Sequence, residues 1–245
     1  MDSFCWCGMI ASKGGVVMKL DHAVWFTERT PDEIAAQNAG AFVGGRHENW
    51  GTYNALKYLQ NAYIEWLAIE QDDVAEDSSH PLVIQLKHDL SASGEGWGTL
   101  CVSTEDIQAL NRKLEKAGMQ TSGVLDASRL TSSGTLKKWK MLFIHDEDLT
   151  DLPFPFFIQW EESEESRRDV LRKEGTITDE SETERISECV LVTESPKRTL
   201  ERWTRILGVQ PENAESLMLN DVRLRFVKNP DEPNRMLAVV TGQAE

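Results

Sequence analysis

The sequence predicts an α+β protein in which one small unit, a strand, a helix and then two or three strands, occurs three times. Each copy opens with an apolar strand, continues with a Thr-Glu pair, and has an amphipathic helix that ends at a glycine, a residue suited to the left-handed conformation after a helix. The copies run from Leu20 to Gly40, from Thr99 to Gly118 and from Ile186 to Gly208. Because one unit alone could not cover the apolar face of its own sheet, we expect the units to pack together.

The first unit, residues 19–95, begins with the apolar run KLDHAVWFT. A helix is predicted next, because Pro31 suits a first helical turn and the neighbouring acids suit the positive end of the helix dipole. A glycine-rich turn between Gly44 and Gly51 follows the helix. The runs GTYNALKYL and AYIEWLAIE are then predicted to form strands.

The second and third units repeat this order. In the second unit, residues 96–162, TLCVST is the first strand, and the runs SRLTSSGTLKKWKMLFI and PFPFFIQWE supply the later ones. The third unit, residues 185–245, is partial, with SLMLNDVRLRFV and RMLAVVTG after its helix. Short apolar or alternating runs between turn residues are typical of strands.

Two segments fall outside the units. Residues 1–18 carry an acid at position 2 and Lys13 within their apolar stretch, so they do not resemble a signal peptide, and we expect a disordered tail or a non-native start. Residues 163–184 are rich in acids and poor in aromatic residues, which indicates an acidic linker or a surface helix.

The composition narrows the range of partners and locations. Acidic residues outnumber basic ones 41 to 26, giving a formal net charge of −15, whereas nucleic-acid binding needs a basic face. No run approaches the roughly 20 apolar residues that a membrane-spanning helix needs. The 4 cysteines show no zinc-site spacing. We therefore expect no nucleic acid or membrane partner, and a reduced, cytoplasmic setting.

Charged groups inside apolar strands point to a site. His22 lies in the first strand and Glu65 in the run AYIEWLAIE, and a charge there is costly unless it is paired, hydrogen-bonded or bound to a metal. The segment GGRHENWGTYNAL between them adds Arg46, His47 and Asn54.

The tandem units and the motifs GGRHENWGTYNAL, AYIEWLAIE and PFFIQW resemble the glyoxalase-like domain branch of the vicinal oxygen chelate superfamily. That superfamily also contains glyoxalases, bleomycin-resistance proteins and extradiol dioxygenases. The resemblance covers residues 19–162 well and the third unit loosely. It implies tandem βαβββ modules that form a cup-shaped mixed sheet, a third partial module at the C-terminus, and a metal held in the cup by the first and last strands of two modules.

Mapped onto this sequence, the resemblance implies His22, Glu65 and Gln159 as metal ligands, with Thr99 at the position that matches His22. Imidazole, carboxylate and amide groups can bind Zn, Ni, Mn or Fe(II), and an open fourth position would admit water or substrate. Threonine and glutamine are weak ligands, so a metal-free site is the alternative. In that case His22 and Gln159 are hydrogen-bonded within the sheet and Glu65 is paired, for example with Arg46.

The other candidates would hold or act on a ligand. Arg46 can bind a carboxylate or phosphate through two hydrogen bonds, Asn54 can bind a ligand oxygen, and His47 can act as an acid or base near neutral pH. The structural alternative is a turn in which the side chains of Arg46 and His47 hydrogen-bond to backbone carbonyl groups. Residues 127–144 contain bases and no acid, so Lys138 and Trp139 are candidates for the cup lining, although a lysine-rich edge strand explains them equally well.

These interpretations support two functions. The first is a metal-assisted lyase, isomerase or dioxygenase that acts on a small anionic compound with vicinal oxygens, with Glu65 and His47 as catalytic residues. The alternative is a metal-free protein that binds or sequesters a small ligand, as bleomycin-resistance proteins do. The third module lacks a partner unit in the sequence and is therefore a candidate for self-association into a homodimer.

Overall fold

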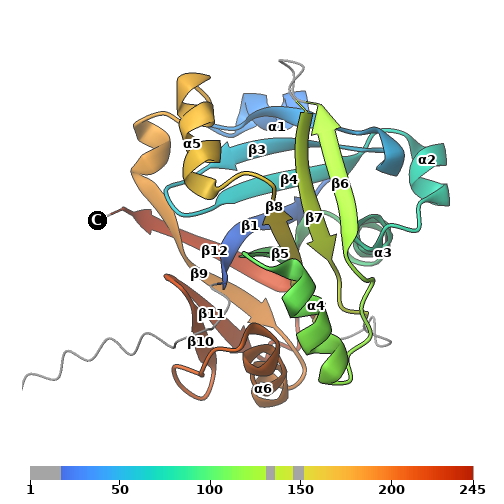
Figure 1. Cartoon of the computed structure of the whole chain (residues 1–245), viewed down its shortest axis with the longest axis vertical. Coiled ribbons are helices and arrows are strands. Elements are labelled where there is room, and N and C mark those ends of the chain that lie inside the picture. The colour runs from blue at the N-terminus through green and yellow to red at the C-terminus, as the bar shows by residue number, and fades with distance from the viewer. Residues whose placement is uncertain (1–17, 131–135, 146–151, 245) are drawn as a thin grey trace, which may run out of the picture.

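The computed structural model describes residues 18–130, 136–145 and 152–244. Within these ranges the chain forms an eight-stranded mixed sheet and a separate four-stranded sheet (Figure 1). Nearly all of the predicted N-terminal tail, residues 1–18, lies outside the described residues.

The first module supplies one half of the large sheet. Its elements are β1 (Met18–Phe26), α1 (Pro31–Gln37), β2 (Phe42–His47), η1 (Glu48–Trp50), β3 (Thr52–Tyr58) and β4 (Tyr63–Ile69). Helix α1 starts where the sequence predicts, because Thr30 and Glu33 form a reciprocal capping box and Pro31 occupies the first turn. Strand β4 is buried almost throughout, which explains its continuous apolar character.

The second module supplies the other half. Its elements are β5 (Gly96–Thr104), α4 (Ile107–Lys116), β6 (Leu125–Leu130), β7 (Leu136–Leu142) and β8 (Phe156–Trp160). The strand order is β2-β3-β4-β1-β5-β8-β7-β6, so the two halves repeat each other on either side of the antiparallel β1–β5 pair. The sheet curves until its two edge strands, β2 and β6, approach each other. The predicted cup is therefore confirmed.

The third module consists of β9 (Glu184–Val192), α6 (Pro196–Leu207), β10 (Ser216–Leu219), β11 (Val222–Val227) and β12 (Met236–Gln243). Its sheet has the order β10-β11-β9-β12, so β12 pairs on the far side of β9 instead of continuing from β11. Trp203 and Phe226 of this module belong to one apolar cluster with Leu100 and Val102 of the large sheet. The third module thus has a packing partner inside the chain, which the sequence did not predict.

The remaining helices join the modules. They are α2 (Asp72–Asp77), α3 (Pro81–Ser93), α5 (Glu164–Lys173) and η2 (Glu180–Glu182). Leu82 and Leu86 of α3 pack into the apolar cluster inside the cup. Helix α5 begins and ends within the acidic segment 163–184. In the described part of the chain, no helix combines the length and the apolar character that crossing a membrane requires.

Candidate functional site

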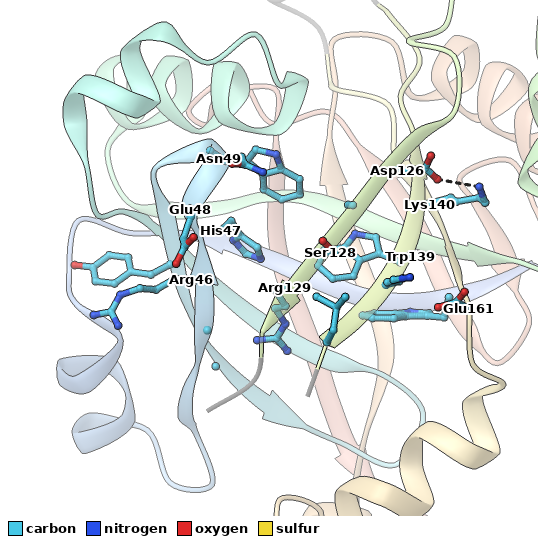
Figure 2. Close-up of a pocket in the computed structure, with 18 of the residues that line it drawn as sticks. Arg46, His47, Glu48, Asn49, Asp126, Ser128, Arg129, Trp139, Lys140 and Glu161 are labelled. Carbon is cyan, nitrogen blue, oxygen red and sulfur yellow. Dashed lines mark hydrogen bonds and ion pairs between the residues drawn. The ribbon is translucent and has the colours of Figure 1, made fainter. Parts of the chain in front are cut away.

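The site is an open cleft that continues into a small inner pocket. The cleft has a volume of about 1380 Å³ and lies between β2 and the β6–β7 hairpin (Figure 2). The inner pocket has a volume of about 40 Å³ and lies inside the cup. Five side chains line both spaces, so the inner pocket is reached from the cleft; they are His47, Trp50, Arg129, Trp139 and Trp160.

Glu65 forms the polar floor of the inner pocket. The amide Nδ2 of Asn54 donates to Glu65 Oε1 at 2.5 Å, and Asn54 Oδ1 accepts from the backbone N–H of Gly45 at 2.9 Å. The other carboxylate oxygen, Oε2, lies 3.3 Å from His22 Nε2. Both oxygens of this buried carboxylate are therefore held in place by side chains of its own module.

A row of alternating charges continues behind Glu65. The Nδ1 atom of His22 lies 2.8 Å from Asp21 Oδ1. The second oxygen of Asp21 accepts from Trp160 Nε1 at 2.9 Å and from Arg167 Nη2 at 3.3 Å. The β1–β5 pairing is irregular between Leu20 and His22, which accompanies this contact between two successive side chains. Neither Asp21 nor Arg167 is among the site residues predicted from the sequence.

These contacts fix the charges in the row. Burial alone would raise the pKa of Glu65, but the contact with His22 and the hydrogen bond from Asn54 outweigh it and lower the pKa to about 2. Burial would lower the pKa of His22, but its contacts with the ionised Asp21 and Glu65 raise it well above the ordinary value. Despite burial, Arg167 and His22 hold the pKa of Asp21 well below its usual range. We conclude that Glu65 and Asp21 are ionised and that His22 is an imidazolium.

His47 belongs to an aromatic wall. Its Nδ1 atom lies 3.1 Å from Thr52 Oγ1, its ring stacks on Trp50 at 4.8 Å, and Trp50 stacks on His80 at 4.0 Å. Burial lowers the pKa of His47, and likewise that of His80, to about 4. His47 is thus a neutral imidazole at pH 7, which does not match the predicted acid–base role near neutral pH.

Arg129, not Arg46, is the arginine that reaches the inner pocket. Arg46 donates to Glu70 at 2.5 Å and its side chain is 68% exposed, and in Figure 2 it points away from the side chains between β2 and β6. Arg129 reaches from β6 towards Gly45, where a Cβ atom would come within 2.6 Å of its Nη1. This Nη1 is buried and has no hydrogen-bond partner among the described residues. Gly45 thus makes room for the arginine.

The predicted basic lining is only partly present. Lys138 is exposed and lines the cleft, while Trp139 is buried and lines both spaces. The described cleft lining holds as many acids as bases. The acids are Asp32, Glu48, Asp126 and Glu161, and the bases are Arg46, Arg129, Lys138 and Lys140. The charges of the cleft lining are therefore balanced, and Arg129 is the one of these four bases that also lines the inner pocket.

Two predicted second-module residues, Gln159 and Thr99, do not line the inner pocket that holds His22 and Glu65. Gln159 lines the outer cleft and not the inner pocket, and its amide donates to Glu105 O at 2.7 Å and accepts from Ile107 N at 3.0 Å, at the start of α4. Thr99 is paired with Val24, and its hydroxyl lies 3.5 Å from Phe154 O. The prediction of Gln159 as a metal ligand together with His22 and Glu65, and of Thr99 as a ligand-binding residue beside them, is corrected accordingly.

The donor set does not fit a divalent ion shared by the two modules. In the first module, Val24 of β1 pairs with Glu65 of β4; in the second module, Cys101 of β5 pairs in the same way with Phe156 of β8. Phe156 therefore occupies the position where a second carboxylate would be needed. Two ligands from one module are fewer than such ions usually take from a protein.

A second group of donors lies behind this pair. Ligand atoms of Asp21, His22 and Cys101 lie within 4.8 Å of one another. Asp21, however, already accepts hydrogen bonds from His22, Trp160 and Arg167. Burial raises the pKa of the Cys101 thiol to about 12, so this residue would be a neutral thiol. This group therefore does not fit a divalent ion either.

Paired βαβββ modules with a cleft at the open seam of their common sheet define the vicinal oxygen chelate architecture, so the predicted α+β class is confirmed. The chain belongs to the glyoxalase-like domain family, whose model matches residues 20–207. The comparison with curated proteins gave no match.

Among solved structures, a hypothetical protein from Staphylococcus aureus is similar over 94% of this chain and 92% of its own, with 23% identity and a TM-score of 0.79. It therefore shares the fold, the third module included. A Streptomyces coelicolor methylmalonyl-CoA epimerase in complex with 2-nitronate-propionyl-CoA is 18% identical, with a TM-score of 0.43 over 59% of this chain and 98% of its own. The epimerase from Mycobacterium tuberculosis is 17% identical, with a TM-score of 0.41 over 61% and 91%.

Proposed function

We propose that this protein binds a small organic anion in the cleft between β2 and the β6–β7 hairpin, with the anionic group on Arg129. The observation that carries the proposal is the buried Nη1 of Arg129, which lacks a partner in the described chain where cleft and inner pocket meet. An unsatisfied buried cation is costly. A carboxylate, phosphate or sulfonate would remove that cost through charge-assisted hydrogen bonds.

The two spaces restrict the shape of the ligand. An inner pocket of about 40 Å³ holds no more than one or two groups the size of a water molecule, so only a small end group enters it. That group should be a hydrogen-bond donor such as a hydroxyl, because Glu65 is ionised and accepts. The bulk of the ligand would lie in the cleft, against Trp139 and Trp50.

The test is a thermal-shift screen of aliphatic and aromatic carboxylates, phosphates and sulfonates, followed by calorimetry on the ligands that stabilise the fold. We expect Arg129→Met to weaken binding at least tenfold, since a hydrogen bond to a charged group contributes about 1.5–3 kcal/mol. Arg46→Met is the matched control and should leave affinity unchanged. Anions that bind equally well to the Arg129→Met variant would overturn the proposal.

A second candidate is catalysis, and the buried row Asp21–His22–Glu65 favours it, because such charges are costly and often mark reactive sites. Glu65 would take a proton from a carbon next to a carbonyl group, the electron pair would move to the carbonyl oxygen, and Arg129 would stabilise the resulting enolate. The low pKa of Glu65 makes it a weak base, so we rank this function second.

Proton NMR in D2O tests this candidate on any ligand found in the screen. Deuterium should enter that carbon with wild-type protein and not with Glu65→Gln, and equal exchange with both proteins would refute it. These functions replace the metal-assisted mechanism predicted from the sequence, because the donor set does not support a shared ion.

A further inference from the structure

We infer that Arg167, on the helix between the second and third modules, is a positioning residue that orients the His22–Glu65 pair through Asp21. This helix, α5, lies in the segment 163–184, for which the sequence predicts a linker or a surface helix. Its contacts instead connect it to the interior of the cup, and the inference requires no ligand to be bound.

Helix α5 is anchored where Arg167 can reach the site. Leu171 and Ile177, on the helix and just after it, pack against Leu56, Tyr58 and Tyr63 of the first module. The neighbouring Arg168 donates to the carbonyl of Leu59 at 3.0 Å and pairs with Glu182 at 3.2 Å. These contacts hold the helix against β3 and β4.

The side chain of Arg167 projects from this helix and is held in place by its contacts. Its guanidinium lies 4.2 Å from the centre of the Trp160 ring, and its side chain is 11% exposed. Its Nη2 lies 3.3 Å from Asp21 Oδ2, the same oxygen that accepts from Trp160 Nε1 at 2.9 Å. Two donors thus fix one oxygen of Asp21 and direct the other towards His22.

Asp21 in turn fixes the imidazole. With Nδ1 of His22 2.8 Å from Asp21 Oδ1, the opposite ring nitrogen faces Glu65 Oε2 at 3.3 Å, and Tyr63 stacks on the ring at 4.4 Å. The order is Arg167, Asp21, His22, Glu65, with alternating charges. Removing the outer cation leaves Asp21, whose side chain is 3% exposed, with His22 as its one remaining ion-pair partner in the described chain.

The test compares Arg167→Met with Arg168→Met by NMR of the histidine ring nitrogens, with the His22 signals assigned from a His22→Gln variant. Arg168→Met is matched because it removes a guanidinium from the same helix without touching Asp21. In wild type and in Arg168→Met we expect the His22 N–H protons to be protected from exchange with water. In Arg167→Met we expect this protection to be lost and the ring-nitrogen signals to shift.

A double-variant cycle separates positioning from general destabilisation. If Arg167 acts through Asp21, then Arg167→Met in an Asp21→Asn background should add no further change to the His22 signals. Arg167→Lys, which keeps the charge, should retain much of the protection and serves if Arg167→Met does not fold. Wild-type His22 signals in a folded Arg167→Met variant, or changes from Arg167→Met and Asp21→Asn that simply add in the double variant, would overturn the inference. A folded Arg167→Lys variant that loses the protection completely would overturn it as well.

Discussion

Mild acid should destabilise this fold through two histidines that stack with Trp50, His47 and His80. Burial lowers both pKa values from 6.5 to about 4. The unfolded chain therefore takes up these protons near pH 6.5, while the folded protein resists them until about pH 4. The free energy of unfolding falls through this window as the pH falls, and between pH 7 and pH 5 each histidine should cost about 2 kcal/mol, at about 1.4 kcal/mol per pKa unit.

The assay is urea unfolding at pH 7 and pH 5, followed by tryptophan fluorescence. His22, whose pKa is raised, acts in the opposite direction over the same range, so the informative quantity is the difference between variants. His47→Gln and His80→Gln should each lose about 2 kcal/mol less than wild type on acidification. His88→Gln is the control, since the side chain of His88 is 47% exposed. An acid-induced loss that is the same in all four proteins would refute the reasoning.

Three further predictions follow from the contacts. Gly45→Ala places a Cβ 2.6 Å from Arg129 Nη1, so calorimetry should show weaker anion binding. The free energy of unfolding should change by less than about 1 kcal/mol, because the end of an arginine side chain can move. Unchanged affinity would contradict this prediction. Asn54→Leu leaves Glu65 Oε1 and the backbone N–H of Gly45 without their hydrogen-bond partner. Urea unfolding should show that the free energy of unfolding falls by about 2–4 kcal/mol. A value as small as that of a neutral surface substitution would contradict this prediction. Elemental analysis after incubation with zinc, nickel, manganese or iron(II) and desalting should give far less than one ion per chain, and a stoichiometric ion would contradict the assignment of Phe156 as a non-ligand.

The repeat in the sequence predicted the large sheet because its signals are local. A strand, a Thr-Glu pair and a closing glycine recur in the same order, and the pairing of two such units follows from their uncovered faces. The position of β12 in the smaller sheet could not be predicted in this way. An apolar run such as Met236–Gln243 predicts a strand, but its pairing with the far side of β9 depends on contacts distant in the sequence.

The site shows the same division. A charge inside an apolar strand identified His22 and Glu65, which the structure brings to 3.3 Å. Strand alternation places Arg46 and His47 on opposite faces, but it does not say which face is inside. For Gln159 the offset is three residues, since Phe156 holds the place equivalent to Glu65, and an odd offset puts a side chain on the other face of a strand.

Other site residues carried weaker signals. Arg129 lies in the stretch 127–144, and the excess of bases there was the sequence signal that pointed to it. Asp21 directly precedes His22, and strand alternation alone would place the two side chains on opposite faces. Their contact at 2.8 Å accompanies an irregularity in the β1–β5 pairing that the sequence pattern did not reveal.

The most direct test of the central claim is a crystal structure with the tightest-binding anion from the thermal-shift screen. The account predicts that the anionic group lies within hydrogen-bonding distance of Arg129 Nη1 and that a small donor group of the same ligand reaches Glu65. A ligand held at the rim by Arg46 or Lys138, with Arg129 still unpaired and the inner pocket empty of ligand, would contradict it.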